Sequence, residues 1–130
     1  MLKKKITYTD YNEEVQTEEF MFNISKSELA EMELSATGGL ESKINKIIRS
    51  NNGADILAMF KEIILMSYGK KSEDGRRFVK SQELIDEFTQ TGAYSELFME
   101  LIGDEKAAAD FVGAIIPAVE PKTVTPKSIG

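Results

Sequence analysis

The apolar segment 54–68 constrains the fold of this chain more than any other part of the sequence. Isoleucine, leucine, methionine and phenylalanine occupy almost every side of a helix drawn through it, and Asp55, Lys61 and Glu62 form a narrow polar stripe. Such a helix must be surrounded by other elements, because only burial removes so much apolar surface from water. Its most apolar run, 56–66, is interrupted by Lys61 and Glu62 and is far shorter than the ~20 apolar residues that cross a bilayer. It therefore predicts the central helix of a globular domain, without a membrane-spanning segment.

The N-terminal residues 4–24 have the pattern of two β strands. Apolar and polar residues alternate over 5–9 and again over 20–24, the two-residue period typical of half-buried strands. The polar run 10–14 between them predicts the turn of an antiparallel hairpin. The apolar phase changes between 15 and 20, which predicts a bulge or a late start of pairing. Two strands alone are marginally stable, so we expect this hairpin to rest on helices.

A capping signal follows the hairpin. Ser25 and Glu28 have the spacing at which a serine hydroxyl accepts from a free helix amide and a glutamate reaches back to the amide of the cap residue. A helix is therefore expected to start there and to stop at the double glycine 38–39. The residues expected to face inward from this helix are Leu29, Met32 and Ala36.

The rest of the chain has mainly helical periodicity. Further helices are expected around residues 40–48, 54–68, 84–88, 94–102 and 107–116, with serine or aspartate caps before the later ones. Gly69 is expected to cap the end of the central helix. The charged segment 70–77 that follows is predicted to be a surface loop.

Together these patterns predict an α+β fold in a single domain over residues 1–117. The antiparallel hairpin 4–24 packs on about six helices between 25 and 117. Residues 118–130 have no periodicity and follow Pro117 with two more prolines, so we expect a flexible C-terminal tail.

Composition limits the chemistry that the domain can perform. The chain has no cysteine and no histidine, so it lacks thiolates, the usual general base near neutral pH and the commonest transition-metal ligand. Its 22 acidic and 16 basic residues leave a net charge of −6, which disfavours nucleic acids and anionic membranes as partners. We therefore expect a protein that is not an enzyme and that uses no cofactor and no metal.

Adjacent carboxylates are the remaining candidates for catalysis. A pair of carboxylates can act as general acid and base when burial separates their pKa values, and a small hydrolase of this kind is one alternative. Adjacent side chains point apart, however, and the pattern is more typical of solvated surface or helix caps. The pairs are Glu13-Glu14, Glu18-Glu19, Glu73-Asp74 and Asp104-Glu105.

Two long stretches carry a family resemblance. ITYTDYNEEVQTEEFMFNISKSELAEMELS, followed by Gly38-Gly39-Leu40, and SYGKKSEDGRRFVKSQELIDEFTQTGAYSELFMEL closely resemble the tail assembly chaperones of siphophages and related prophages, especially those of Gram-positive hosts. The resemblance covers about residues 6–116. It lies in the order of hairpin, capped helix, double glycine, SEDG loop and AYSELF helix rather than in one short motif.

The resemblance implies a transient factor of phage morphogenesis. Members of this family escort the tape measure protein, a long and largely helical polypeptide, in the host cytoplasm until tail tube subunits polymerise around it, and they are normally absent from the finished virion. Many are made in two lengths by translational frameshifting, with the extension recruiting tube subunits, and this chain resembles the shorter form. The runner-up function is a structural tail completion or connector component that stays in the virion.

A helical client would need an apolar helical surface on the chaperone. We expect that surface on the exposed parts of helices 94–102 and 107–116. Alternatively, these residues all belong to the domain's own core, as amphipathic stripes usually do. The candidate anchors are Tyr94, Phe98, Met99 and Phe111. Self-association through an edge strand of the hairpin is a further possibility.

Overall fold

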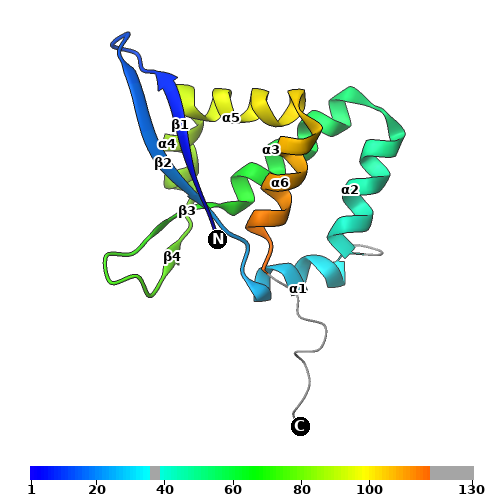
Figure 1. Ribbon diagram of the computed structural model, residues 1–130. Helices are drawn as coiled ribbons and strands as arrows, with labels where there is room; N and C mark the ends of the chain where they lie inside the picture. Colours follow the sequence, from blue (N-terminus) through cyan, green and yellow to red (C-terminus); the bar gives the residue numbers. More distant parts are fainter. Residues whose placement is uncertain (36–38, 118–130) are drawn as a thin grey trace.

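The computed structural model describes residues 1–35 and 39–117, so the expectations for Ala36 and for the tail 118–130 lie outside it. Within the described residues, a four-stranded antiparallel sheet of order β1-β2-β3-β4 lies against six helices, which confirms the predicted α+β class (Figure 1). The elements are β1 (Leu2–Thr9), β2 (Val15–Phe22), α1 (Lys26–Ser35), α2 (Gly39–Ser50), α3 (Gly53–Ser67), β3 (Tyr68–Lys71), β4 (Phe78–Val79), α4 (Gln82–Thr89), α5 (Gly92–Gly103) and α6 (Glu105–Ile115).

The predicted N-terminal hairpin is confirmed, but the expected bulge or late start of pairing is wrong. β1 and β2 pair without interruption from Leu2 opposite Phe22 to Thr9 opposite Val15. The polar turn closes on the carboxylate of Asp10, which accepts hydrogen bonds from following backbone amides. This end of the hairpin projects past α5 (Figure 1), and Val15 there is 73% exposed. Because no face of the strand is buried at this end, its residues do not have to alternate between apolar and polar.

The sheet has two strands that were not expected. Tyr68 and Gly69 lie in β3, which pairs with the end of β2, and β4 pairs with β3 in turn. Gly69 is therefore a strand residue rather than a helix cap. A Cβ atom at Gly69 would lie 2.6 Å from the carbonyl oxygen of Val79 and 2.7 Å from the ring of Phe78, so only glycine fits this close approach. The predicted surface loop shortens to 72–77, because its first two residues are part of β3.

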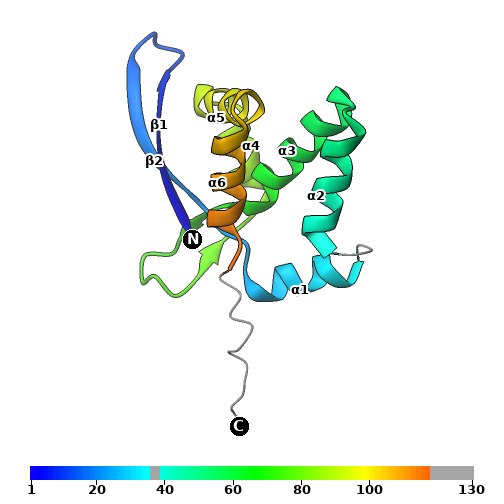
Figure 2. The ribbon, with the colours of Figure 1, turned by 45° about the vertical axis from the view of Figure 1, so that its right-hand side comes forward.

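The core lies between the sheet and the helices. Figure 2 shows the hairpin along one side of the helices, with α5 and α6 next to it. Phe22 is fully buried, and its ring lies 5.7 Å from that of Tyr68, 5.9 Å from that of Phe88 and 5.2 Å from that of Phe111. The rings of Tyr68 and Phe88 stack at 4.3 Å. This aromatic cluster joins the sheet to α4 and α6.

The central position of α3 is also confirmed, although its apolar surface is not fully covered. Its buried residues are Met59, Phe60, Ile63, Ile64 and Ser67. Leu57, in contrast, is 42% exposed, and Ile56 is only half-buried. Part of the apolar surface of this helix therefore faces outward near its N-terminal end.

Candidate partner-binding groove

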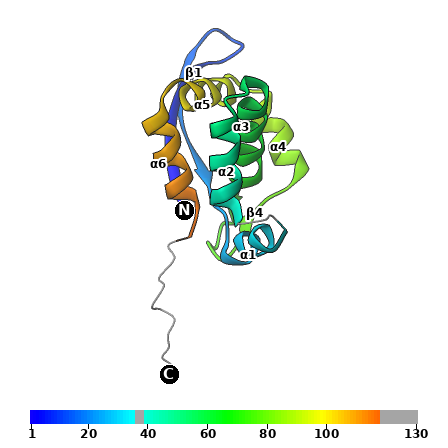
Figure 3. The same cartoon turned by 90° about the vertical axis from the view of Figure 1, so that its right-hand side faces the viewer.

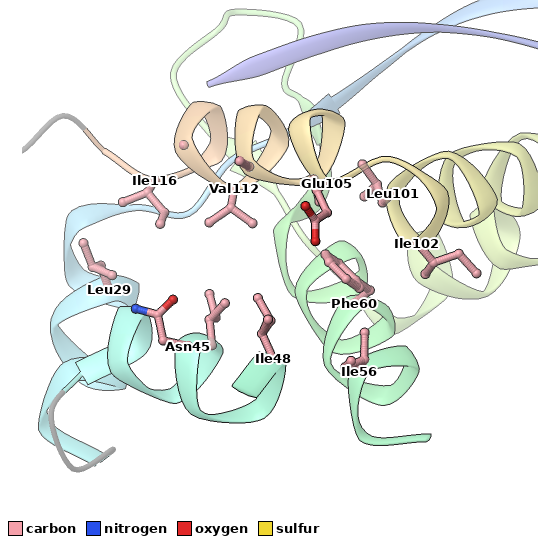
Figure 4. Close-up of a pocket in the computed structure, with 14 residues that line it drawn as sticks. Leu29, Asn45, Ile48, Ile56, Phe60, Leu101, Ile102, Glu105, Val112 and Ile116 are labelled. Carbon is pink, nitrogen blue, oxygen red and sulfur yellow. The ribbon is translucent and has the colours of Figure 1, made fainter. Parts of the chain in front are cut away.

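A groove of about 740 Å³ opens between α2 and α6 (Figure 4). The two helices run in opposite directions (Figure 1), and the view from the α2 side in Figure 3 shows them next to each other with α1 beneath α2. α3 and the end of α5 close one end of the groove, and α1 lies at the other. The lining residues are Leu29, Ile44, Asn45, Ile48, Ile56, Phe60, Leu101, Ile102, Glu105, Ala108, Ala109, Val112, Gly113 and Ile116. All except Asn45 and Glu105 are apolar or glycine.

The α6 wall of the groove comes from a helix with one wide apolar face. Phe111 and Ile115 are buried in the core, whereas Ala108 and Val112 face the groove and remain half-buried. An apolar face this wide is normally covered across its whole width. Here only the core side is covered by residues that the structure describes. The α6 face therefore forms an apolar surface open to a partner.

The opposite wall comes from α2. Ile44 and Ile48 are four residues apart, so they lie one above the other on the same face of the helix, with Asn45 beside them. Ile48 is 47% exposed, and together with the other lining residues it forms a contiguous apolar surface. The helix is held against α3 by a tight turn in which Asn51 has a φ of 55° and the Asn52 side chain caps α3.

The α1 end of the groove is fixed by a polar cluster. The capping box is confirmed: the Glu28 amide donates to the Ser25 hydroxyl at 3.1 Å, and the Ser25 amide donates to the Glu28 carboxylate at 2.8 Å. Lys80 donates to both oxygens of that carboxylate at 2.8 and 2.9 Å and to the carbonyl oxygen of Met66 at 2.9 Å. Leu29, the next residue of α1, is thereby held at the groove.

The ionisation of Glu28 reflects this cluster. Burial alone would raise the pKa of the Glu28 carboxyl, but the hydrogen bonds from Lys80 and from Ser25 outweigh it and hold the pKa below its usual value. The carboxylate is therefore charged at neutral pH, and it ties α1 to the segment after β4 and to the end of α3.

The four anchors expected from the sequence lie away from the lining of this groove. Phe111 is 3% exposed and packs against Phe22, so its side chain is covered within the domain. Tyr94 and Phe98 are half-buried and form a chain of ring contacts with the core, Tyr94 lying 5.6 Å from the ring of Phe88. Met99 is 62% exposed on α5. Partner contacts by Tyr94, Phe98, Met99 and Phe111 stay a prediction.

The two helices on which a partner surface was expected nevertheless contribute to the groove. The half-buried face of helix 107–116 lines it, as does the end of helix 94–102, but through residues other than the proposed anchors. The sequence expectation placed a partner surface on this helix without naming the lining residues Val112 and Ile116. The contribution of α2 was not expected, because the sequence pattern of Ile44 and Ile48 is the same whether these residues face a core or a groove.

In three of the four pairs of adjacent carboxylates, one member has a local role. Asp104 caps α6 by accepting from the amides of Lys106 and Ala107 at 3.0 and 3.2 Å. Asp74 accepts from the hydroxyl of Ser72 at 2.7 Å, and Glu18 accepts from the hydroxyl of Tyr8. Within residues 1–35 and 39–117, acidic side chains do not gather in threes as a metal site would require, and no helix there is long and apolar enough to cross a membrane.

Comparison with known proteins identifies a family. A family model described as phage tail assembly chaperone matches residues 1–124, which is nearly the whole chain. Neither a curated protein nor a solved structure matches it. The match includes both the hairpin and all the helices that line the groove, so the chain belongs to the phage tail assembly chaperone family.

Proposed function

We propose that this protein binds the tape measure protein of its phage and keeps it soluble while tail tube subunits are recruited. It acts in the host cytoplasm and leaves before the virion is complete. It does so by binding alone, without catalysis, in keeping with a sequence that has neither histidine nor cysteine.

The open apolar groove between α2 and α6 is the observation that carries this proposal. A long helical client exposes apolar stripes until the tail tube encloses it, and those stripes drive aggregation unless another surface covers them. The groove offers such a surface on a domain whose other large apolar side chains are mostly internal. Membership of the family supports the same role.

Co-expression with the tape measure protein encoded in the same genome tests the proposal. We expect the client to be insoluble when made alone and to become soluble and co-purify when this chain is present. An unrelated acidic domain of similar size serves as the control for general solubilisation. A client that stays insoluble, or that becomes soluble without any association, would contradict the proposed function.

The proposed function and its structural alternative differ in whether the chain stays in the finished virion. Mass spectrometry of purified particles should find no copies of this chain, whereas a stoichiometric amount would favour a structural tail completion or connector component. We further propose that tube subunits are recruited through a longer, frameshifted product.

Self-association is a separate proposal. β1 is an edge strand of the sheet and is available for pairing with another copy. Sedimentation of the purified chain tests this proposal.

A further inference from the structure

We infer that the α2–α6 groove holds one amphipathic α-helix of about three turns. The helix would insert aliphatic side chains at i, i+3 or i+4, and i+7, and would place a basic residue next to Glu105. This inference rests on the proposed function, because it names the form in which the client is held.

The chemistry of the walls selects a helix over an extended peptide. Five helices line the groove, α1, α2, α3, α5 and α6, and helix backbones bond internally, so they offer an occupant few free backbone donors or acceptors. No strand of the described sheet lines it. An extended peptide would therefore bury unpaired N–H and C=O groups against apolar side chains, which is unfavourable. A helix satisfies its own backbone and presents only side chains.

The length of the groove sets the length of the occupant. The α6 side of the groove runs from Glu105 to Ile116, the residue just after the helix, which corresponds to about 16 Å at the helical rise of 1.5 Å per residue. A helix lying along the groove would thus be covered over about three turns. That length accommodates three or four side chains of one apolar stripe.

The two walls differ in a way that suits a helix packed lengthwise. On the α6 side, Ala108, Ala109 and Gly113 are small, so the backbone of an occupant can approach closely there. On the α2 side, Ile44 and Ile48 are bulky and lie four residues apart. Side chains repeating every three or four residues on the occupant would interdigitate with this pair, as ridges fit into grooves between packed helices.

The charge at one end gives the occupant a direction. Glu105 lies at the start of α6, and Figure 4 shows its carboxylate turned into the groove beside Phe60. Its neighbour Lys106 pairs instead with Asp110 at 3.0 Å. In the part of the chain that the structure describes, Glu105 has no ion pair or side-chain hydrogen bond. A lysine or arginine at that end of the occupant would complement this carboxylate.

This mode of binding would prevent the client from pairing with itself. The apolar stripe that enters the groove is the same stripe that forms the seam of a coiled coil. A bound segment is therefore kept helical but unpaired, and it becomes free for assembly only when the chaperone leaves.

Two designed peptides test the helical mode against the full-length chain. The first has about 18 residues, long enough for an isolated helix, with leucine at i, i+4 and i+7 among alanine, glutamate and lysine and a lysine at one end of the stripe. The second replaces two alanines by proline and cannot form the helix. We expect the helical peptide to shift the methyl NMR signals of Ile44, Ile48 and Val112. The proline peptide should bind at least about tenfold more weakly by calorimetry.

Three variants locate the binding surface. Ile48→Glu introduces a charge into the groove and should weaken the helical peptide by at least about tenfold. Leu57→Glu is the matched control, because Leu57 is similarly exposed on a neighbouring helix but does not line the groove, and its affinity should be unchanged. Glu105→Lys should weaken the peptide with the terminal lysine and strengthen a version with glutamate at that position. Circular dichroism of each variant confirms that it is folded.

Several outcomes would overturn the inference. Equal binding of the proline peptide would exclude the helical mode, and methyl shifts confined to surfaces outside the groove would exclude the site. If Ile48→Glu still makes the full-length tape measure protein soluble like the unaltered chain, the groove is not the client site although the proposed function stands. If the groove binds the helical peptide but the unaltered chain does not keep the client soluble, the proposed function fails and the groove assignment remains.

Discussion

Replacing Phe111 by alanine should destabilise the fold rather than simply remove a contact with a partner. Its side chain is 3% exposed, and its ring lies edge-on to the fully buried ring of Phe22 at 5.2 Å. Truncation would leave a cavity where the sheet meets α6. Loss of a buried phenylalanine typically costs about 3–5 kcal/mol, of which an edge-to-face pair contributes roughly 0.5–1.5 kcal/mol.

This cost is large relative to the stability of a domain. Single domains unfold with a free energy of about 5–15 kcal/mol. In a chain of this size each kcal/mol shifts the melting temperature by roughly 3–5 °C, so Phe111→Ala should lower it by roughly 10–20 °C. Phe111→Leu keeps most of the volume and should cost no more than about 1.5 kcal/mol.

Urea unfolding measures this difference directly. The chain has no tryptophan and four tyrosines, so far-ultraviolet circular dichroism and tyrosine fluorescence are the suitable probes. Equal slopes for the three proteins would show that they unfold from equally compact states. The reasoning fails if Phe111→Ala loses less than about 1 kcal/mol of stability yet loses client binding while folded, because Phe111 would then act as a partner contact.

Further predictions concern the sheet, the polar cluster and the two candidate surfaces. Gly69→Ala should lower the urea midpoint by the equivalent of about 1–3 kcal/mol, because the added methyl group meets backbone at 2.6 Å, and an unchanged midpoint would refute this. Glu28→Gln should remove up to about 1 kcal/mol at neutral pH, because the half-exposed pair with Lys80 is partly screened. The folded-state pKa of Glu28 is lowered, so its contribution to stability is present above the unfolded-state pKa and is lost as the pH falls through the folded-state pKa. The stabilities of the variant and the unaltered protein should therefore converge in acid, and urea midpoints at a series of pH values measure this. In co-expression, Ile48→Glu should reduce recovery of soluble client more than Met99→Glu does, and the reverse order would favour the α5 surface expected from the sequence.

Local signals in the sequence were sufficient for the hairpin, the capped start of α1 and the central helix. In each case the deciding interaction lies within a few residues, as in the reciprocal bonds of Ser25 and Glu28. The alternation of the strands and the all-round apolarity of 54–68 likewise depend only on neighbouring positions. The family assignment was also available from the order of these elements.

The pairing of β3 with β2 and β4 could not be predicted from such local signals. β3 is short and ends in Lys70 and Lys71, a composition more typical of a loop, and it becomes a strand because β2 and β4 offer it hydrogen-bond partners. The close approach that requires Gly69 arises from the same pairing.

The amino-acid pattern was enough to predict the hairpin and the apolar helices, whereas the tertiary packing decided which apolar faces are covered. Periodicity places Phe111 and Val112 on different sides of one helix, but both are apolar, so spacing cannot tell which side meets the core. Only the packing of α6 against Phe22 buries Phe111 and leaves Val112 facing Ile48 across the groove. The groove joins residues from five helices far apart in the chain, and its existence depends on their arrangement in space rather than on any local pattern.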